Sequence, residues 1–257
     1  RRGLLQRDPS GVFRVTQPRG TGPLVRQEIF LEPIGADAVF AAPRAVRIQM
    51  QVGAVELDEM GSITTPASSA RLQYSVDSEL EVTPPPGLRD AAWPVVSQPP
   101  GAARYLQLPP LPDRISALAR EVTAGSRSPY EAALKLNHYL STQFTYTLVL
   151  KQQTTLGPLE EFLFVRRSGN CEYFAASLAV MLRSVGIPAR VVGGFQRGEW
   201  NPYGRYFMVR MMDAHSWVEA FFDGAGWVTL DPSPRAAAEE ALGGPSTWSL
   251  YVDAARM

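Results

Sequence analysis

The sequence contains one cysteine, and it stands where a thiol can be activated. Cys171 follows the pair Gly169–Asn170. Glycine permits a tight turn, and asparagine is a good N-cap. Apolar residues then recur at helical spacing as far as Gly186 and Pro188, which predicts a helix that starts at Cys171. A thiol in the first helical turn lies at the positive end of the helix dipole, where the nucleophilic thiolate is favoured.

Two further side chains could complete a catalytic set with this thiol. A lone cysteine is more often a small buried hydrophobic residue. Thiol catalysis also needs a base, and a third group that orients the base. His215 opens one strand pattern, and Asp231 closes the next one. Taken singly, His215 reads as a core histidine and Asp231 as a turn opener before proline, but the joint arrangement with Cys171 is more specific.

The register of these two strands decides whether the histidine and the aspartate can meet. The turn at 223–226 makes the strands antiparallel neighbours. If Phe221 lies opposite Trp227, a five-residue loop joins that pair, and Asp231 becomes a diagonal neighbour of His215 on the same face. We therefore predict a five-residue loop or a β-bulge here. A regular four-residue hairpin would turn the aspartate to the other face.

The surrounding pattern is typical of an α+β protein in which strands, then helices, then an antiparallel sheet follow one another. Period-two alternation predicts strands near 25–32, 46–52 and 72–82, with turns at 58–61 and 66–69. Helices are expected over 115–125, 128–143 and 158–164, the second with a capping box formed by Ser128 and Glu131. His138 lies in that helix and reads as structural or exposed. Strands are expected over 190–195, 206–212, 216–222 and 227–231, with a polar loop at 199–204.

This pattern divides the chain into four parts. Residues 1–83 form a small antiparallel β domain, and residues 84–111 form a Pro-rich connecting segment that Trp93 and Tyr105 pin to a surface. Residues 112–235 form the core that bears the motifs. Residues 236–257 form a tail in which Trp248 and Tyr251 could dock.

Composition removes several functional classes. The 257 residues carry no formal net charge, so nothing favours nucleic acid or an anionic membrane as a partner. One cysteine and two histidines make a poor structural metal site, and no nucleotide-binding motif occurs, so we expect neither metal nor cofactor. No apolar run has the length of about 18 residues that a spanning helix needs. The chain starts without methionine and reads as a fragment of a longer protein.

Three segments resemble the core of the transglutaminase-like superfamily. They are Gly169-Asn170-Cys171-Glu172-Tyr173-Phe174-Ala175 with Gly186-Ile187-Pro188-Ala189-Arg190-Val191-Val192, then Asp213-Ala214-His215-Ser216-Trp217-Val218-Glu219, and then Gly226-Trp227-Val228-Thr229-Leu230-Asp231-Pro232-Ser233-Pro234. The order Cys, His, Asp is similar to that of the family. The upstream β region and the Pro-rich link resemble a bacterial subgroup, in which this domain is the extracytoplasmic part of a multi-spanning inner-membrane protein.

The resemblance implies a papain-like α+β fold and acyl transfer through a thioester. Cys171 would attack the γ-carboxamide of a glutamine in a protein or peptide, and an amine or water would take the acyl group. His215 would act as base and then acid, with Asp231 as its orienter. The backbone N–H of Cys171 would form an oxyanion hole with a second donor, for which Tyr146 is the candidate. A tyrosine packed in a strand is the alternative reading of Tyr146.

Glu172 is the feature that opposes thiolate formation, because a carboxylate beside the sulfur would repel its negative charge. We therefore expect its side chain to point away from Cys171, toward Arg166, Arg167 or Arg190.

The same residues leave two other functions open. A cysteine peptidase or amidase acting on envelope or cell-wall peptides would use the same nucleophile, and an inactivated scaffold would serve as a binding module. We expect a periplasmic location, membrane attachment through segments outside this chain, and a monomeric soluble fragment.

Overall fold

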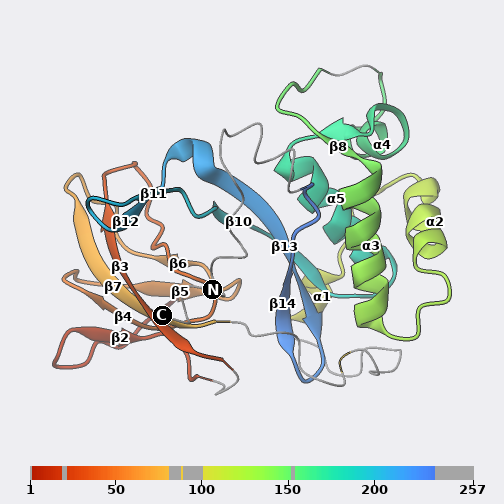
Figure 1. The fold of residues 1–257 in the computed structure, drawn as a ribbon. Coiled ribbons are helices and arrows are strands. Elements are labelled where there is room, and N and C mark those ends of the chain that lie inside the picture. The colour runs from red at the N-terminus through yellow and green to blue at the C-terminus, as the bar shows by residue number, and fades with distance from the viewer. Residues whose placement is uncertain (1, 19–21, 81–87, 89–100, 152–153, 235–257) are drawn as a thin grey trace. The chain divides into compact units, whose positions relative to one another are not determined.

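The computed structural model describes residues 2–18, 22–80, 88, 101–151 and 154–234 (Figure 1). The chain divides into two compact units, Arg1–Pro84 and Pro85–Met257. Trp93 and most of the connecting segment lie outside the described residues, as does the tail with Trp248 and Tyr251. The predicted boundaries of these two segments therefore stay predictions.

The first unit consists of antiparallel strands, as the alternation predicts. Its strands are β1 (Arg2–Leu4), β2 (Val12–Arg14), β3 (Leu24–Leu31), β4 (Ala45–Met50), β5 (Glu56–Asp58), β6 (Ile63–Thr64) and β7 (Leu72–Glu79). One sheet has the order β2-β4-β7-β3, and the other has the order β1-β5-β6. The three long strands match the expected ones. The four short strands were not expected, because two or three residues are too few to show a period of two.

The helices of the second unit precede its main sheet. They are α1 (Ala102–Tyr105), α2 (Asp113–Val122), α3 (Pro129–Gln143), α4 (Pro158–Glu161), the π-helical turn η1 (Phe162–Arg166) and α5 (Cys171–Ser184). Two short strands, β8 (Thr145–Tyr146) and β9 (Ser168–Gly169), pair in parallel between them. Tyr105, which was expected to pin the connecting segment, is buried edge-on against Trp227, with 4.7 Å between the ring centroids.

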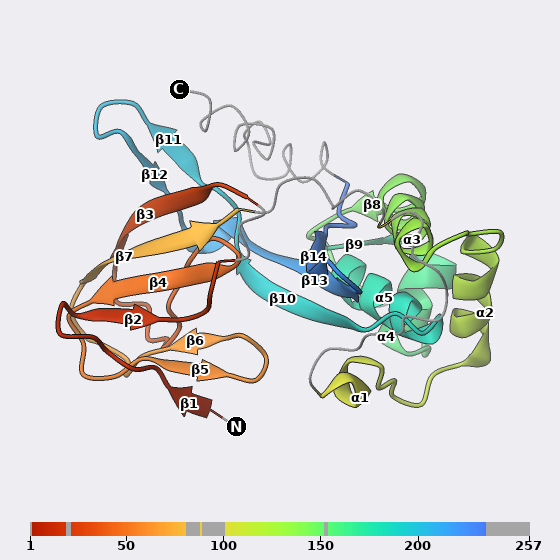
Figure 2. The ribbon, with the colours of Figure 1, turned by 90° about the horizontal axis from the view of Figure 1, so that it is seen from below.

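The main sheet of this unit has the order β10-β13-β14 and is antiparallel. Its strands are β10 (Ala189–Phe195), β13 (Ala214–Phe222) and β14 (Gly226–Leu230). Helices α2, α3 and α5 lie on one side of it (Figure 2). The α+β order predicted from the sequence is therefore confirmed.

The segment between β10 and β13 differs from the prediction. The expected loop at 199–204 contains strand β11 (Glu199–Asn201), which pairs with β12 (Tyr206–Met208) as a separate two-stranded ribbon. The strand expected over 206–212 ends at Met208, and a 3₁₀ turn η2 (Met211–Asp213) follows it. The prediction was wrong because Pro202 and Gly204 dominate the local pattern, although they form only the turn of a hairpin.

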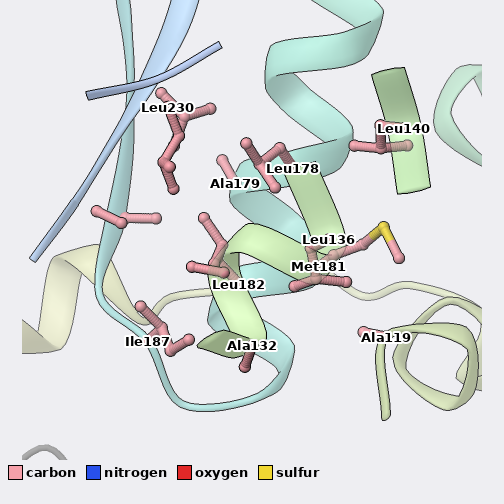
Figure 3. Close-up of a cluster of buried hydrophobic side chains, with 14 of the residues drawn as sticks. Ala119, Ala132, Leu136, Leu140, Leu178, Ala179, Met181, Leu182, Ile187 and Leu230 are labelled. Atoms are coloured by element: carbon pink, nitrogen blue, oxygen red, sulfur yellow. The ribbon is translucent and has the colours of Figure 1, made fainter. Parts of the chain in front are cut away.

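Helix α5 lies at the centre of the hydrophobic core of the second unit. Leu178 and Leu182 of α5 are fully buried, with Leu136 and Leu140 of α3 and Leu230 of β14 in the same cluster (Figure 3). This packing fixes the direction of α5, and so it fixes the position of the helix start that carries Cys171.

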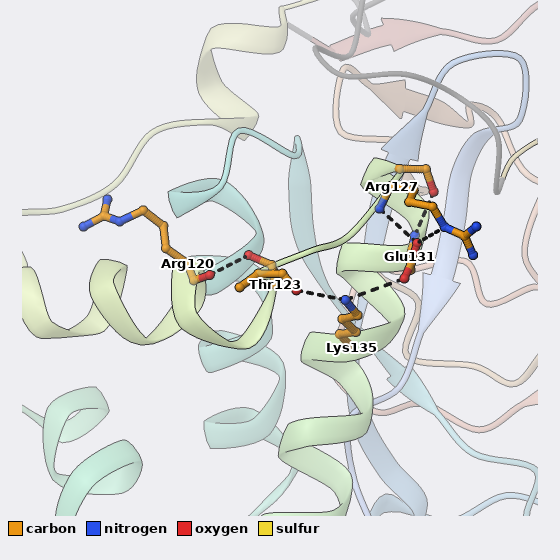
Figure 4. A network of polar contacts seen from close by, with 7 residues as sticks. Arg120, Thr123, Arg127, Glu131 and Lys135 are labelled. Atoms are coloured by element: carbon orange, nitrogen blue, oxygen red, sulfur yellow. Dashed lines mark hydrogen bonds and ion pairs between the residues drawn. The ribbon is translucent and has the colours of Figure 1, made fainter.

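The cap of helix α3 differs from the predicted capping box in one bond. The Ser128 hydroxyl accepts the Glu131 N–H at 3.1 Å, as expected. The Glu131 carboxylate accepts the N–H of Arg127 at 3.0 Å rather than that of Ser128 (Figure 4). Lys135 lies 3.6 Å from the same carboxylate, which adds a charged pair on this exposed helix face.

The register of β13 and β14 is the predicted one. Phe221 pairs with Trp227, so five residues separate the two. Pairing continues to Phe222 and Gly226, which leaves a turn of residues 223–225. Continuing the register past Val218 and Leu230 places Asp231 opposite Trp217 and diagonal to His215.

Replacing Leu182 by alanine tests the role of α5 in the core. We expect the free energy of unfolding to fall by about 2–5 kcal/mol, because the change leaves a cavity in a close-packed core. Chemical denaturation followed by circular dichroism measures it. Leu148 is 58% exposed and provides the matched control. Equal losses for Leu182→Ala and Leu148→Ala would contradict the central position of α5.

Candidate active site

The turn before α5 holds Cys171 in place by close packing. A Cβ at Gly169 would lie 2.9 Å from the Tyr173 Cβ and 3.1 Å from the Phe162 ring, so only glycine fits there. The Asn170 side chain accepts the Tyr173 N–H at 3.4 Å and caps the helix. Cys171 is therefore the first residue of α5, as predicted, and it is 8% exposed.

Strand pairing brings Tyr146 to the same place. Tyr146 lies opposite Gly169 in the parallel β8–β9 pair, and its ring stacks on Phe174 at 6.3 Å between centroids. Its phenol lies close enough to the Cys171 thiol that each group shifts the pKa of the other, that of the thiol downward and that of the phenol upward. The two groups named from the sequence as oxyanion donors thus lie beside each other.

Buried His215 pairs with the half-buried Asp231 at the end of the hairpin. His215 Nε2 lies 2.8 Å from Asp231 Oδ2, and the histidine is 5% exposed. The other carboxylate oxygen, Oδ1, accepts the Ser233 N–H at 3.0 Å, which orients the carboxylate. Because Asp231 occupies Nε2, the nitrogen left for the hydrogen bond to Cys171 is Nδ1.

The partners of His215 favour its charged form. Burial alone would lower the pKa of the imidazole. Hydrogen bonds with Asp231 and Cys171, together with the negative charges of both groups, outweigh burial and raise the pKa of His215 to about 9. The imidazole therefore carries its proton at neutral pH in this arrangement.

The pKa of the Cys171 thiol is lowered, whereas that of His215 is raised. Burial raises the pKa of Cys171, but hydrogen bonds from His215 and from the Ser216 backbone N–H oppose it. The charge of His215 and the Tyr146 hydroxyl act in the same sense, and the net pKa of the thiol lies below its ordinary value. Cys171 and His215 are thus arranged as a thiolate–imidazolium pair.

Tyr146 keeps its proton next to this thiolate. Burial and the neighbouring negative charge of Cys171 raise the pKa of Tyr146 to about 12. The phenol therefore keeps its proton at neutral pH, where it can donate a hydrogen bond.

Glu172 is exposed to solvent, and the arginine partners expected for it are wrong. Its side chain is exposed, and among the described residues it makes no ion pair with an arginine. Arg166 lies over the Tyr173 ring, and Arg167 lies over the Phe144 ring. Arg190 pairs with Glu219 at 2.6 Å. These arginines are engaged elsewhere, so solvent rather than a counter-charge surrounds Glu172.

Three neighbours of the site were not predicted. The Ser216 backbone N–H contributes to the lowered pKa of the Cys171 thiol, which no side-chain pattern in the sequence indicates. Trp217 stacks on His215 at 6.3 Å between ring centroids. A Cβ at Gly194 would lie 2.7 Å from Trp217 Cη2, so this glycine makes room for the indole beside the histidine. A Gly opposite a His is visible in the sequence only once the β10–β13 register is known.

The arrangement suits nucleophilic chemistry more than metal chemistry. His138, the other histidine, lies exposed on α3. Within the described ranges, no three His, Cys, Asp or Glu side chains gather closely enough to hold a metal ion. A thiolate, a proton carrier and two N–H or O–H donors that converge on one sulfur can form and resolve an acyl-thioester.

Known proteins are similar to this chain in sequence. The model of the transglutaminase-like superfamily matches residues 116–232. A protein-glutamine gamma-glutamyltransferase of Pseudomonas aeruginosa is 40% identical over 154 residues, which are 56% of this chain and 23% of that protein. The uncharacterised protein YebA of Bacillus subtilis is 38% identical over 138 residues, 51% of this chain and 19% of YebA. The matched segment is thus about a fifth of the length of these relatives.

A solved structure extends the similarity to most of the chain. The periplasmic domain of TgpA from Pseudomonas aeruginosa, bound to ethylmercury, is 30% identical with a TM-score of 0.69. The alignment covers 90% of this chain and 82% of that one.

The pH dependence of alkylation tests the thiolate–imidazolium pair. We expect iodoacetamide to react with Cys171 with a midpoint below the ordinary thiol pKa of about 8.5. In Asp231→Asn the imidazolium loses its counter-charge, so the thiol pKa rises and the rate at pH 7 falls about tenfold for each pKa unit. Mass spectrometry over time measures the rate. His138→Gln is the control and should leave the profile unchanged. A wild-type midpoint at the ordinary value would argue against the pair.

Proposed function

The chain belongs to the transglutaminase-like superfamily, and from that premise we propose that it catalyses thiol-dependent acyl transfer with Cys171, His215 and Asp231 as its catalytic triad. The observation that carries the proposal is the partly buried 2.8 Å bond between His215 and Asp231 beside a thiol of lowered pKa. A merely structural cysteine would not need an oriented imidazolium next to it.

The proposed donor is the γ-carboxamide of a glutamine in a protein or peptide. The Cys171 thiolate attacks the carboxamide carbon and forms a C–S bond. His215 gives its proton to the leaving nitrogen as the C–N bond breaks, so that ammonia departs and a thioester remains. An amine then attacks the thioester, His215 takes a proton from it, and the C–S bond breaks to restore the thiolate.

Tyr146 is the proposed second oxyanion donor. The negative charge that develops on the carboxamide oxygen needs N–H or O–H donors at hydrogen-bonding distance. The strand pairing of Tyr146 with Gly169 and the mutual pKa shifts of Tyr146 and Cys171 support this role, because they place a protonated phenol beside the start of the helix that carries the Cys171 N–H.

The choice of glutamine and amine rests on similarity. The matched relative of Pseudomonas aeruginosa bears the name protein-glutamine gamma-glutamyltransferase, which supports the same donor here. With water as acceptor, the same steps would deamidate the glutamine or, with another acyl donor, hydrolyse a peptide. Transfer is favoured over a peptidase or amidase because the relative that is 40% identical over 154 residues carries the transferase name.

The proposed location is extracytoplasmic. The similar solved structure is a periplasmic domain, which supports a periplasmic position for this chain. No helix in the described part of the chain is long and apolar enough to cross a bilayer. Attachment to an inner membrane through other segments, and a monomeric state, remain part of the proposal.

Incorporation of a primary amine tests the reaction. A fluorescent alkylamine and dimethylated casein are incubated with the chain, and label in the casein band is followed on a gel. We expect labelling by wild type and loss of at least about 10³-fold in Cys171→Ala, because the nucleophile is absent. Released ammonia without label would identify hydrolysis and overturn transfer. Absence of any Cys171-dependent turnover would sink the proposed function.

Tyr146→Phe separates the oxyanion role from the packing role. The ring and its stacking on Phe174 remain, while the O–H donor is removed. We expect kcat for amine incorporation to fall about 10²-fold. The unfolding midpoint should not change. An unaltered kcat would leave Tyr146 as a packed strand residue.

A further inference from the structure

The segment between β10 and β13 exposes an unusual amount of apolar surface. We call residues 197–212 the apolar ribbon. Its exposed large apolar side chains are Trp200, Tyr203, Tyr206, Phe207, Val209, Met211 and Met212, and Tyr203 at the turn is 98% exposed. Single exposed apolar residues are ordinary, but a contiguous group of this kind marks an interaction surface.

The apolar ribbon is paired only with itself in the described part of the chain. Strands β11 and β12 form a two-stranded sheet in which Trp200 lies opposite Phe207, with ring centroids 4.7 Å apart. Because the sheet has only these two strands, both outer edges offer backbone N–H and C=O groups to a further strand. An isolated hairpin of this size is marginally stable in water, so an added strand would also stabilise it.

The base of the apolar ribbon is fixed beside the active site. Gly194 pairs with His215, and the Gln196 N–H donates to the Asp213 carbonyl at 2.8 Å. The Arg210 N–H donates to the Asp213 carboxylate at 2.6 Å. At Gly198 a Cβ would collide with the Met208 carbonyl oxygen, so the two arms of the ribbon lie close together at this point. These contacts join the ribbon to the residues that directly precede His215.

We propose that the apolar ribbon is an exosite, which binds an extended segment of the polypeptide acyl donor by strand addition. The inference rests on the proposed acyl-transfer function and adds the substrate class: a protein with an extended, apolar or aromatic segment outside the reactive glutamine. Main-chain bonds at a free edge would give affinity, and the exposed aromatic side chains would select apolar neighbours.

Charge favours a polypeptide over an anionic surface as the occupant. Two of the three arginines of the apolar ribbon are already engaged. Arg197 lies over the Phe207 ring, and Arg210 pairs with Glu199 at 2.9 Å. The ribbon therefore offers little free positive charge to lipid headgroups, while its apolar side chains and strand edges match an extended peptide.

The length of the apolar ribbon makes the proposed exosite selective for long acyl donors. A three-residue strand spans roughly 10 Å, and the turn extends beyond it. A dipeptide donor cannot occupy Cys171 and the turn of the ribbon together. A protein donor can, so the two kinds of donor should respond differently to changes in the ribbon.

The test compares two donors in the full chain. The variant Trp200→Thr/Phe207→Thr removes the aromatic pair and keeps residues that favour strands. With dimethylated casein we expect kcat/KM for amine incorporation to fall at least about tenfold, mainly through KM, while a blocked Gln-Gly dipeptide changes by less than about twofold. Tyr203→Ser is a milder second variant that cannot disturb packing. Phe30→Thr, on an exposed strand position of β3, is the matched control and should change neither value.

The results that would overturn the exosite differ from the result that would overturn the proposed acyl-transfer function. Equal losses for both donors would show that the ribbon supports the active site and would overturn the exosite, as would unchanged kinetics for casein. Unchanged casein kinetics with loss of binding to phosphatidylglycerol vesicles, or with a change in sedimentation, would assign the ribbon to a membrane or to a second copy. If wild type uses neither donor, the proposed function fails. In that case the exosite is tested by casein binding alone, measured with Cys171→Ala in the presence and absence of the Trp200→Thr/Phe207→Thr changes. Binding about tenfold weaker with those changes would support the exosite, and equal binding would reject it.

Discussion

The hydrogen bond between His215 and Asp231 depends on one geometric constraint, which is the register of β13 and β14. The pairing of Phe221 with Trp227 sets the aspartate diagonal to the histidine, and a shift of one residue would turn it to the other face. The bond then leaves Nδ1 of the imidazole for the thiol and raises the pKa of His215. The negative charge on Cys171 is stabilised by this pair. The turn at 223–225 sets the register of the two strands, so the reactivity of the thiol depends on that turn.

The second requirement is the position of the helix that carries the thiol. The buried side chains of α5 fix the helix against α3 and the sheet, while Gly169 and Asn170 fix its first residue. Tyr146 lies near the same helix start because it pairs with Gly169, two positions before Cys171, in the β8–β9 ladder. Core packing and strand pairing therefore bring together side chains from three separate segments, and the helix dipole, the imidazolium and the Ser216 N–H then favour the thiolate together.

Local patterns in the sequence predicted those features of the fold that are set by residues close together in the chain. The start of α5, the long strands and the constraint on the β13–β14 loop all follow from spacing. Contacts that depend on the backbone of a distant segment could not be predicted, such as the Ser216 N–H at the sulfur or the pairing of Tyr146 with Gly169. The β11–β12 ribbon was missed because its strands have three residues each and surround a turn rich in proline and glycine. The partners of Glu172 were misassigned because ring stacking and Glu219 engage the arginines instead.

The titration of the His215 imidazole is a direct test of the thiolate–imidazolium pair. The chain has only two histidines, so nitrogen NMR of labelled protein resolves each ring, with His138→Gln to assign them. We expect His215 to remain protonated through neutral pH and to lose its proton near pH 9, with Nε2 bonded to Asp231. A midpoint at the ordinary histidine value of about 6.5 would contradict the thiolate–imidazolium pair.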